Sequence, residues 1–466
     1  MTPESRVSPM LLVIAADASL LEAPGWGVTS PSRGGSRRSE VAAMQPIETV
    51  PVDRTTCCIV GCGPAGAVLG LLLGRAGLDV LLLEKYPDFF RDFRGDTIHA
   101  STLQILDELD LLSKFEKVPQ QRTTSISIVT DAGTATLGDF TTLPGKFQYI
   151  SFVPQWDFLS FITVEAEQYP SFRLLRRAEA FALVEDGGSV RGVRYRTPEG
   201  VREVRAALTV ACDGRHSAIR AAARLDTIDF GAPMDALWFR VPKAPDDPSG
   251  TFARLAQGRL IPMIDRRTYW QGAYVMPKGG FPQLKARGVG ALHAELRRYI
   301  PMLGDRVEAA ITSWDDVGFL EVKVNRLKRW YRPGLLCIGD SAHAMSPIGG
   351  VGINLAIQDA VATANLLAGP LRAGTVSERD LAAVQRRRQF PTALTQRVQL
   401  LMQRNMISPL LKSKGSAQLP RAMRVALGAP VLRRALPRLL ARFMAIGFRS
   451  EHVRTAPARG LPQAAP

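Results

Sequence analysis

The sequence predicts an α/β fold in which a Rossmann-type nucleotide-binding domain carries an inserted antiparallel β-sheet and ends in a helical C-terminal region. Three stretches support this prediction: a glycine-rich turn between a β-type and a helix-type run in residues 55–85, strand-type runs in residues 226–330, and helix-type spacing in residues 371–466. A chain of 466 residues is longer than one core usually supports, so more than one packed domain is expected. No uncharged apolar stretch approaches the roughly 20 residues that cross a membrane, which predicts a soluble protein.

Residues 1–50 are predicted to form a disordered extension. The stretch "TSPSRGGSRRSE" is polar, rich in Gly and Ser, and without periodicity, so it has too little apolar surface to bury. The run "MLLVIAADASLL" has no clear basic segment before it, which argues against a signal peptide. We expect residues 1–43 to be dispensable for folding, with Met44 as an alternative start.

The first ordered element is a strand, turn, helix and second strand in residues 55–85, "TTCCIVGCGPAGAVLGLLLGRAGLDVLLLEK". Gly61, Gly63 and Gly66 follow the first strand directly, and they suit a tight turn, close approach of backbone to a pyrophosphate, and close helix packing. The free N–H groups at the helix start favour phosphate there. Glu84 ends the second strand, where an acidic residue accepts hydrogen bonds from ribose hydroxyls. This element predicts a bound dinucleotide, either FAD or NAD.

Two later stretches repeat the pattern of a strand followed by a turn with an acidic residue. The stretch "CDGRHSAIR" places Asp213 and Gly214 after a strand-type run, and "GDSAHAMSPIGGVGINLAIQDA" places Asp340 before a glycine-rich loop and a helix. A carboxylate at a strand end can bind polyol hydroxyls, and the glycines admit a flat ring against the backbone. The helix dipole would favour an anionic reduced flavin. Because an NAD-only dehydrogenase does not need this second site, FAD is the favoured dinucleotide.

In this order and at these separations, the three motifs resemble the FAD-dependent monooxygenases of the p-hydroxybenzoate hydroxylase type, the class A flavoprotein aromatic hydroxylases. The resemblance covers the framework of residues 55–370. It implies a glutathione-reductase-like FAD-binding domain at residues 51–225, with part of the substrate sheet interleaved, and a return segment at residues 331–370. A substrate-binding β-sheet domain is expected at residues 226–330, followed by the basic helical region at residues 371–466.

The resemblance also implies which residues contact the cofactor. Asp213 and Gly214 would serve FAD and the nicotinamide nucleotide, and Asp340 would hold the flavin ribityl chain. The segment "FRDFRGDTIHASTLQIL" resembles the family's Arg-containing segment, which implies that Arg94 contacts the flavin. Where many relatives carry an Arg, "FVPQWDFLSFI" has Gln155, so a phosphate contact there would be a neutral hydrogen bond. The complete predicted set is Gly61, Gly63, Pro64, Ala65, Gly66, Glu84, Lys85, Arg94, Gln155, Asp213, Gly214, Gly339, Asp340, Pro347, Gly349, Gly350, Gly352, Ile353 and Asn354.

The substrate surface is expected in residues 226–330. The runs "MDALWFRVPK", "GRLIPMIDRR" and "TYWQGAYVMPKG" predict successive antiparallel strands separated by turns. One face could cover the flavin with aromatic surface, although packing against the nucleotide-binding domain explains the same alternation. The pocket candidates are Trp238, Arg240, Trp270, Tyr274 and Pro347, which precedes the glycine loop.

The resemblance implies a monooxygenase reaction. NADH or NADPH would reduce FAD, O2 would give a flavin C4a-hydroperoxide, and its terminal oxygen would hydroxylate or epoxidise a lipophilic, aromatic small molecule. Because the flavin carries this chemistry, no side chain is assigned a catalytic role. The five histidines lack metal-ligand spacing, so no metal is expected. His99 and His343 could touch the flavin or the substrate, but a structural hydrogen bond is the simpler role for both.

The net charge of +16 lies almost entirely in residues 371–466, which hold 18 Lys and Arg against 3 Asp and Glu. No base-stacking aromatic pattern accompanies these charges, so a nucleic-acid partner is not expected. In "RALPRLLARFMAIGFR", helical spacing favours a helix whose apolar face packs on the enzyme. Weak contact with an anionic membrane and a basic entrance for an acidic substrate stay open. The odd number of cysteines, without metal spacing, favours a cytoplasmic location.

Two other functions stay open. A same-fold flavin reductase or dehydrogenase would bind FAD without inserting oxygen, and a nucleotide-carrying adaptor would use the basic C-terminus to hold a partner or a membrane. A flavin-dependent halogenase is disfavoured because the WxWxIP element of those enzymes is not found. Neither the substrate nor the choice between NADH and NADPH follows from the sequence.

Overall fold

The computed structural model describes residues 50–89, 97–131, 133–256, 258–413 and 430–458, with side chains omitted for residues 430–434. These residues all belong to one compact unit, Val50–Pro466. The predicted N-terminal extension and Arg94 therefore lie outside the described residues.

The central sheet is the Rossmann-type sheet that the sequence predicts. Within the described residues it has eight strands, and its main path runs β19-β20-β11-β1-β2-β8. The pairs β1–β2, β1–β11, β2–β8 and β11–β20 are parallel, so the carboxyl ends of these strands meet at one edge. Strand β2 is buried along its whole length, as expected for a parallel strand covered on both faces. The strands are β1 (Val52–Val60), β2 (Val80–Glu84), β8 (Phe172–Arg176), β9 (Glu179–Asp186), β10 (Ser189–Thr197), β11 (Gly200–Ala211), β19 (Tyr331–Arg332) and β20 (Leu335–Cys337).

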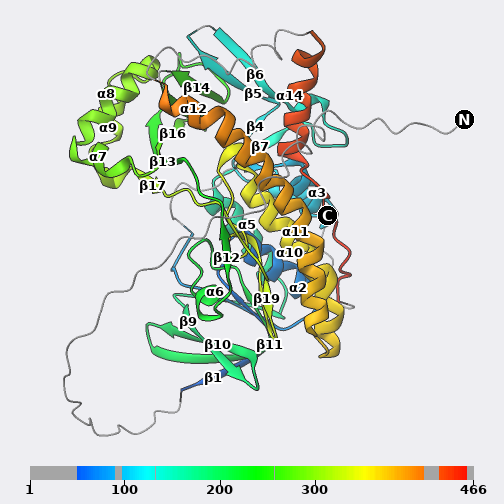
Figure 1. The fold of residues 1–466 in the computed structure, drawn as a ribbon. Helices are drawn as coiled ribbons and strands as arrows, with labels where there is room; N and C mark the ends of the chain where they lie inside the picture. Colours follow the sequence, from blue (N-terminus) through cyan, green and yellow to red (C-terminus); the bar gives the residue numbers. More distant parts are fainter. Residues whose placement is uncertain (1–49, 90–96, 132, 257, 414–429, 459–466) are drawn as a thin grey trace, which may run out of the picture. The chain divides into compact units, whose positions relative to one another are not determined.

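Long helices pack beside this sheet. Helix α2 (Pro64–Arg75) starts with proline at its first position, where the missing N–H costs nothing, and packs against α5 (Gln155–Glu167) and α10 (Val351–Ala373). Helix α11 (Glu378–Met402) begins with a capping box and runs beside α10 (Figure 1). The segment Ile348–Ala373, which includes α10, is long and apolar enough to cross a membrane, but 78% of its most apolar window is buried inside the protein. It is therefore a core helix of the fold.

The predicted antiparallel sheet is also present. Seven strands pair in the order β17-β13-β16-β15-β14-β5-β6 within the described residues, and only the β14–β5 pair is parallel. Two of them come from the interleaved part of the first domain. The strands are β5 (Ser125–Thr130), β6 (Gly133–Asp139), β13 (Met234–Pro242), β14 (Phe252–Ala256), β15 (Arg259–Asp265), β16 (Tyr269–Pro277) and β17 (Gly318–Leu320).

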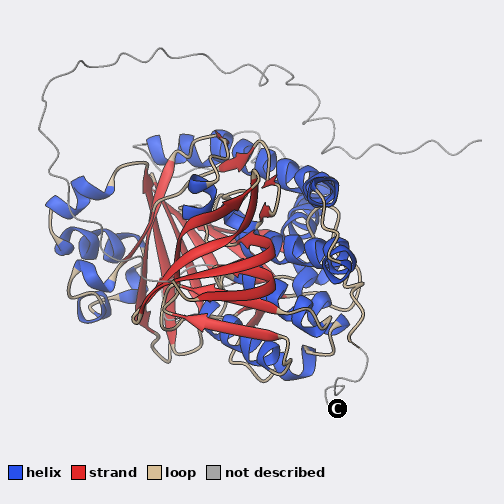
Figure 2. Ribbon diagram, turned by 90° about the horizontal axis from the view of Figure 1, so that it is seen from below, coloured by secondary structure: helices blue, strands red, loops and turns tan. Residues whose placement is uncertain are grey.

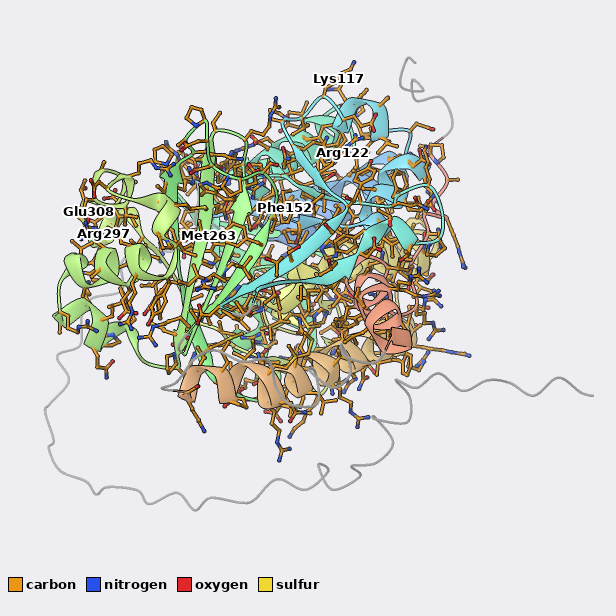
Figure 3. The ribbon with its side chains drawn as sticks, turned by 90° about the horizontal axis from the view of Figure 1, so that it is seen from above. Lys117, Arg122, Phe152, Met263, Arg297 and Glu308 are labelled. Atoms are coloured by element: carbon orange, nitrogen blue, oxygen red, sulfur yellow. The ribbon has the colours of Figure 1, made fainter. Side chains whose placement is uncertain are left out.

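Three helices that the sequence analysis did not predict cover one face of this sheet. They are α7 (Phe281–Ala286), α8 (Val289–Tyr299) and α9 (Arg306–Ala310). Figure 3 shows Met263 within the sheet and Arg297 and Glu308 on the helices beside it. Nη1 of Arg297 and Oε1 of Glu308 are 3.0 Å apart and link α8 to α9.

The C-terminal region is helical, as predicted. Helix α11 continues through a π-helical turn, Gln403–Ile407, into α12 (Ser408–Lys412). Helix α14 (Pro430–Ala445) packs against β6 and the 3-10 turn Phe140–Thr142. Figure 2 shows helices of the described chain packed around the strands.

The remaining elements are short. They are β3 (Thr97–Ile98), β4 (Gln121–Thr123) and β7 (Ile150–Phe152) in one small sheet, β12 (Thr227–Asp229) and β18 (Asn325–Leu327) in another, the helices α3 (Ala100–Glu108), α4 (Leu112–Phe115) and α6 (Ala218–Ala222), and the 3-10 turns Pro301–Leu303, Trp314–Asp316, Gly339–Ser341 and Ile348–Gly350.

Candidate active site

A cavity of about 1340 Å³ lies between the carboxyl edge of the central sheet and one face of the antiparallel sheet. A pocket for a single small ligand usually has a volume of about 300–1,000 Å³. The cavity can therefore hold more than one ligand. Its two halves, here called the flavin half and the sheet half, differ in chemistry.

The glycine turn after β1 forms one end of the flavin half. Gly61 has a φ of +97°, and a Cβ there would lie 2.7 Å from the carbonyl oxygen of Cys212. A Cβ on Gly66 would lie 2.0 Å from the carbonyl oxygen of Gly61. Gly61, Gly63, Pro64 and Ala65 line the cavity, whereas Gly66 lies behind them in a packing position. The N-terminus of α2 therefore presents bare backbone to the cavity.

Glu84 lies beside this turn at the end of β2. Its Oε2 accepts a hydrogen bond from the N–H of Cys62 at 2.9 Å, and its Oε1 accepts one from the N–H of Tyr86 at 3.0 Å. The side chain is buried and lines the cavity with Lys85. These two bonds fix the position of the carboxylate at the cavity wall, where an acidic residue can accept hydrogen bonds from ribose hydroxyls.

The turn after β11 also reaches the cavity, but its carboxylate is used locally. Asp213 accepts hydrogen bonds from Oγ of Ser217 at 2.5 Å and from the N–H of Ile219 at 3.2 Å. Burial raises the pKa of Asp213, although these donors oppose the rise. Asp213 and Gly214 line the cavity, so the turn borders the nucleotide site while its carboxylate organises the start of α6.

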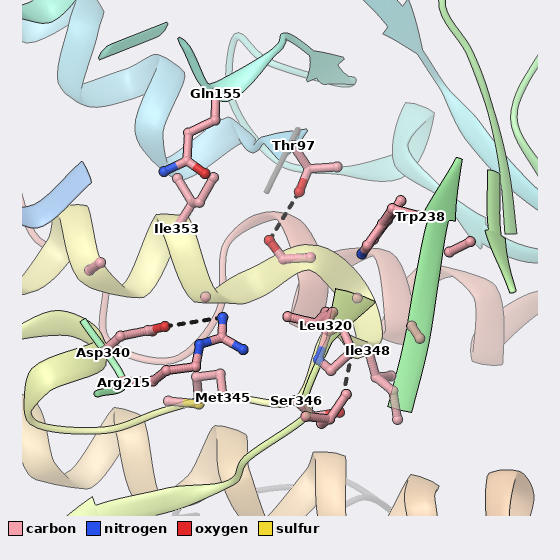
Figure 4. A pocket seen from close by; sticks show the side chains of 18 of the residues that line it. Thr97, Gln155, Arg215, Trp238, Leu320, Asp340, Met345, Ser346, Ile348 and Ile353 are labelled. Carbon is pink, nitrogen blue, oxygen red and sulfur yellow. Dashed lines mark hydrogen bonds and ion pairs between the residues drawn. The ribbon is translucent and has the colours of Figure 1, made fainter. Parts of the chain in front are cut away.

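Asp340 projects into the cavity from the 3-10 turn after β20 (Figure 4). Its Oδ2 lies 3.5 Å from Nη2 of Arg215, whose Nη1 donates to the carbonyl of Glu321 at 3.1 Å. The Asp340 side chain is 33% exposed, which leaves it accessible to a ribityl chain. Gly339 lies behind it and does not line the cavity.

The glycine loop before α10 forms the next part of the wall. Pro347, Gly349, Gly350, Gly352 and Ile353 line the cavity, as the sequence analysis expected of this loop. Gly349 and Gly350 have positive φ values of +79° and +63°. A side chain at either position would strain the turn.

Asn354 holds this loop from behind. Its Oδ1 accepts from the N–H of His99 at 2.9 Å and from Oγ1 of Thr102 at 2.7 Å, while its Nδ2 donates to the carbonyl of Thr97 at 3.0 Å. Asn354 does not line the cavity. Its side chain joins the start of α3 to the start of α10.

Gln155 begins α5 and faces Ile353 across the flavin half (Figure 4). The residue is neutral and sits at a helix N-terminus, so any contact with a phosphate would be an uncharged hydrogen bond assisted by the helix dipole.

These observations fit FAD. The turn at Gly61 has no room for a Cβ, the N-terminus of α2 offers free N–H groups, and carboxylates stand at the ends of β2 and β20. When bound, FAD supplies the redox and oxygen-transfer chemistry. The flavin half would hold the cofactor through Gly61, Gly63, Glu84 and Asp340 and would place its ring against the glycine loop.

The sheet half is lined almost wholly by apolar side chains. All seven described strands of the antiparallel sheet contribute to it, with residues on β5, β6, β13, β14, β15, β16 and β17. Representative residues are Ile126, Leu137, Ala236, Trp238, Phe252, Leu260, Ala273 and Val275. Trp238 projects from β13, and its Nε1 is buried with no acceptor in the described part of the chain (Figure 4).

Three of the expected pocket residues do not line the cavity. Trp270 and Tyr274 lie on the opposite face of the antiparallel sheet, where Trp270 Nε1 donates to Asp247 at 2.8 Å and Tyr274 OH donates to Glu295 at 3.1 Å. Trp270 and Tyr274 face away from the cavity, contrary to the expectation, because α7, α8 and α9 provide an apolar surface on the opposite side of the sheet. Arg240 lies over the ring of Trp156 at 4.9 Å, beyond the cavity edge.

The sequence analysis missed the C-terminal wall of the sheet half. Its residues come from the end of α11, the π-helical turn, α12 and α14: Met402, Met406, Ile407, Pro409, Leu410 and Met444. The spacing of Met402 and Met406 by four residues signals one helix face. Nothing in the sequence indicates that this face meets the sheet.

The two histidines near the site are buried and hydrogen-bonded. His99 Nδ1 bonds to the carbonyl of Met444 at 2.6 Å, and His343 Nε2 bonds to Oδ2 of Asp359 at 2.6 Å. Among the described residues, no group of His, Cys, Asp and Glu could hold a metal ion. The five cysteines are buried and form no disulfide among the described residues.

Comparison with known proteins agrees with this site. The chain matches the family described as FAD binding domain over residues 54–398. It is 34% identical over 393 residues to the 6-methylpretetramide 4-monooxygenase of Streptomyces rimosus, covering 84% of this chain and 93% of that relative.

Solved structures share the fold. The OxyS anhydrotetracycline hydroxylase of Streptomyces rimosus superposes with a TM-score of 0.65 at 23% identity, covering 84% of this chain and 76% of that chain. The flavin-dependent halogenase CmlS superposes with a TM-score of 0.67 at 18% identity, covering 82% of this chain and 72% of that chain. At these identities the structures show the fold alone, and the fold serves more than one flavin chemistry.

The family match and the 34% identical relative decide among these chemistries. They confirm the predictions of FAD as cofactor, NAD(P)H as electron donor and oxygen insertion as the reaction. The chain belongs to the FAD-dependent monooxygenases of the p-hydroxybenzoate hydroxylase type, enzymes that use NAD(P)H and O2 to oxygenate an aromatic small molecule.

Proposed function

We propose that the substrate is a multi-ring aromatic polyketide that lies against the antiparallel sheet with its reacting ring beside the glycine loop. The continuity and size of the cavity carry this proposal, because about 1340 Å³ exceeds the volume of a usual one-ligand pocket and includes both halves. The name of the relative from Streptomyces rimosus, a 6-methylpretetramide 4-monooxygenase, supports the same substrate class.

The sheet half suits a flat, apolar molecule. Its wall carries aliphatic and aromatic side chains from seven strands, and the methionines of the C-terminal wall can adapt to different ring systems. This surface also keeps water from the reacting flavin face. A small hydrophilic phenol would leave much of this apolar wall uncovered.

Trp238 is the residue that would orient the substrate. A buried donor without an acceptor is costly, and ligand pockets commonly use a few such groups to fix orientation. The Nε1–H of Trp238 would donate to a carbonyl or phenol oxygen of the polyketide.

A substrate screen with the purified FAD-loaded enzyme tests the proposal. Fused aromatic polyketides of two to four rings and monocyclic phenols are compared for acceleration of NAD(P)H oxidation, and products are measured by mass spectrometry under ¹⁸O2. We expect one labelled oxygen in a multi-ring product. A clear preference for monocyclic phenols would contradict the substrate class, and turnover without labelled oxygen would favour the reductase alternative.

The choice of donor and the location of the protein are finer parts of the same proposal. Parallel assays with NADH and NADPH identify the donor. The five buried thiols, which form no disulfide among the described residues, support a reducing cytoplasm. Weak membrane contact through the basic helices is tested by co-sedimentation of the full-length protein with anionic and neutral liposomes, and equal recovery with both would contradict it.

A further inference from the structure

The C-terminal segment Arg449–Ala458 lies beyond the matched family region and packs onto the FAD-binding domain. The N–H of Ala458 donates to the carbonyl of Arg75 at 2.9 Å, at the end of α2. Asn365 of α10 donates to the carbonyl of His452 at 2.8 Å. This segment therefore crosses the helices that carry the flavin half.

Glu451 is the charged residue of this segment that enters the core. Its side chain is 5% exposed. Its carboxylate binds Arg387 through bonds of 2.7 and 3.1 Å and Nη1 of Arg388 at 3.2 Å. Its N–H donates to Oε1 of Gln358 in α10. The backbone N–H of Glu451 is thus fixed to α10, and its carboxylate is fixed to α11.

Arg388 links Glu451 to Asp359, which is fully buried. Nε of Arg388 donates to Oδ1 of Asp359 at 2.9 Å, and the exposed fractions of the two side chains are 1% and 0%. Burial opposes ionisation of Asp359, but His343 and Arg388 outweigh it, so the pKa of the carboxyl is lowered. Charges buried this completely need their partners, because an unpaired charge in the core is strongly destabilising.

The hydrogen-bond network that starts at Glu451 ends at Asp359, which contacts the turn that carries Asp340. Its Oδ2 accepts from the N–H of Gly339 at 3.1 Å and from Nε2 of His343 at 2.6 Å. Gly339 begins the 3-10 turn Gly339–Ser341, and His343 follows that turn. Two bonds accepted by one carboxylate therefore hold the backbone N–H before Asp340 and the His343 side chain after it.

We propose that Glu451 is a positioning residue for the flavin site, acting through Arg388 and Asp359 on the turn that aims Asp340 into the cavity. The inference concerns the cofactor half and does not depend on the proposed substrate. A competing explanation is that Glu451 only fastens the C-terminal segment to the domain.

Glu108 provides a matched control for that explanation. It lies at the end of α3 and accepts from Nδ1 of His452 at 2.5 Å and from the N–H of Val453 at 2.8 Å. It fastens the same segment, one and two residues beyond Glu451, but its hydrogen bonds in the described structure go to Gln104, His452 and Val453 and not to Arg388 or Asp359. E451Q and E108Q therefore weaken the same attachment, and only E451Q changes the network that reaches Asp340.

The experiment measures the FAD dissociation constant of each apoprotein by flavin fluorescence, the visible circular dichroism of the bound flavin, and the Tm of the apoprotein. We expect E451Q to weaken FAD binding between about 3-fold and about 30-fold, and to alter the flavin dichroism. E108Q should lower the Tm while leaving FAD affinity and dichroism as in the parent. E451D, which keeps the charge, should give intermediate affinity and restore the dichroism.

Equal effects of E451Q and E108Q on FAD affinity would overturn the proposal. So would a lower Tm for E451Q with unchanged affinity and dichroism. If E451Q does not fold, E451D decides: an FAD affinity equal to that of the parent, despite a lowered Tm, would also overturn the proposal.

Discussion

The two halves of the cavity are lined by different kinds of chemical group. The flavin half consists of backbone turns and buried polar groups, in which Glu84, Asp213 and Asn354 each make two or more defined hydrogen bonds. The sheet half consists of apolar side chains on seven strands and a C-terminal wall. In its wall the buried Nε1 of Trp238 has no acceptor among the described residues.

This difference determines how each half should respond to change. Hydrogen-bonded turns tolerate little displacement, because each shift breaks bonds that no water replaces in the core. Apolar surfaces tolerate changes of shape at modest cost. We therefore expect large, all-or-none losses in the flavin half and graded effects in the sheet half.

The largest effect is expected for G66A. A Cβ at this position would lie 2.0 Å from the carbonyl oxygen of Gly61, so the turn must move. A shift costing about 3 kcal/mol weakens FAD binding by at least about 100-fold. Fluorescence titration of the apoprotein with FAD measures the loss.

The control for this substitution is G187A. Gly187 also has a positive φ, +55°, but a Cβ there meets nothing within 4 Å. G187A should lower the Tm slightly and leave FAD affinity unchanged. If G66A bound FAD as the parent does, the turn would be more adaptable than its geometry indicates.

Lowering the pH should decrease the stability of the folded protein through His99, which lies beside the flavin half. Burial lowers the pKa of His99 to about 4, although the bond to the Met444 carbonyl opposes the shift. Its ordinary value is about 6.5, so below that pH the unfolded chain binds the proton more readily than the folded protein does. This contribution to stability is complete above pH 6.5 and is lost as the pH falls toward 4, by on the order of 3 kcal/mol.

H99Q isolates this contribution, because glutamine does not titrate. Urea unfolding of the two apoproteins is compared between pH 7.5 and pH 4.5. The parent should lose more stability than H99Q over this range. Parallel curves would show that His99 takes up its proton without cost in the folded state.

Substitutions of Trp238 and Trp270 test the different roles of the two faces of the antiparallel sheet. W238F removes a donor that would bind the substrate, so we expect KM to rise by about tenfold with little change in kcat. The Tm should stay the same or rise, because the buried Nε1 has no acceptor in the described structure.

W270F is the comparison on the opposite face. It removes the bond from Nε1 to Asp247 and loosens the packing against Phe252 and the helices. It should lower the Tm and leave KM unchanged. If W270F raised KM and W238F did not, the assignment of the faces would be reversed.

The flavin half was predictable because its residues belong to short motifs at strand ends. Gly61, Glu84 and Asp340 each lie at or just after the end of a recognisable strand, where a glycine turn or an acidic residue indicates a nucleotide site. Asn354 and Gly66 were correctly placed in these motifs, but the structure puts both behind the cavity wall. A motif identifies the turn without stating which of its side chains face the ligand.

The sheet half was less predictable because it depends on contacts distant in sequence. Alternation along β16 separates Trp270 and Tyr274 from Ala273 and Val275, but it does not say which side is the pocket. The helices α7, α8 and α9 decide this by covering the aromatic side. The link from Glu451 to Asp359 is equally remote, since 92 positions separate the two residues.

The smallest effect is expected for Q155R, which tests whether residue 155 contacts a cofactor phosphate in the flavin half. An arginine at the N-terminus of α5 opposes the helix dipole, which costs about 0.3–1 kcal/mol. A charge-assisted bond to a cofactor phosphate is worth about 1.5–3 kcal/mol in favourable geometry, so a net gain of a few-fold in FAD affinity is expected. This gain should shrink as salt is raised, because a partly exposed charge is screened. Titrations of parent and Q155R with FAD at low and high salt give the comparison. Weaker FAD binding by Q155R at low salt would show that Gln155 faces no phosphate and that the diphosphate is held by the backbone of α2.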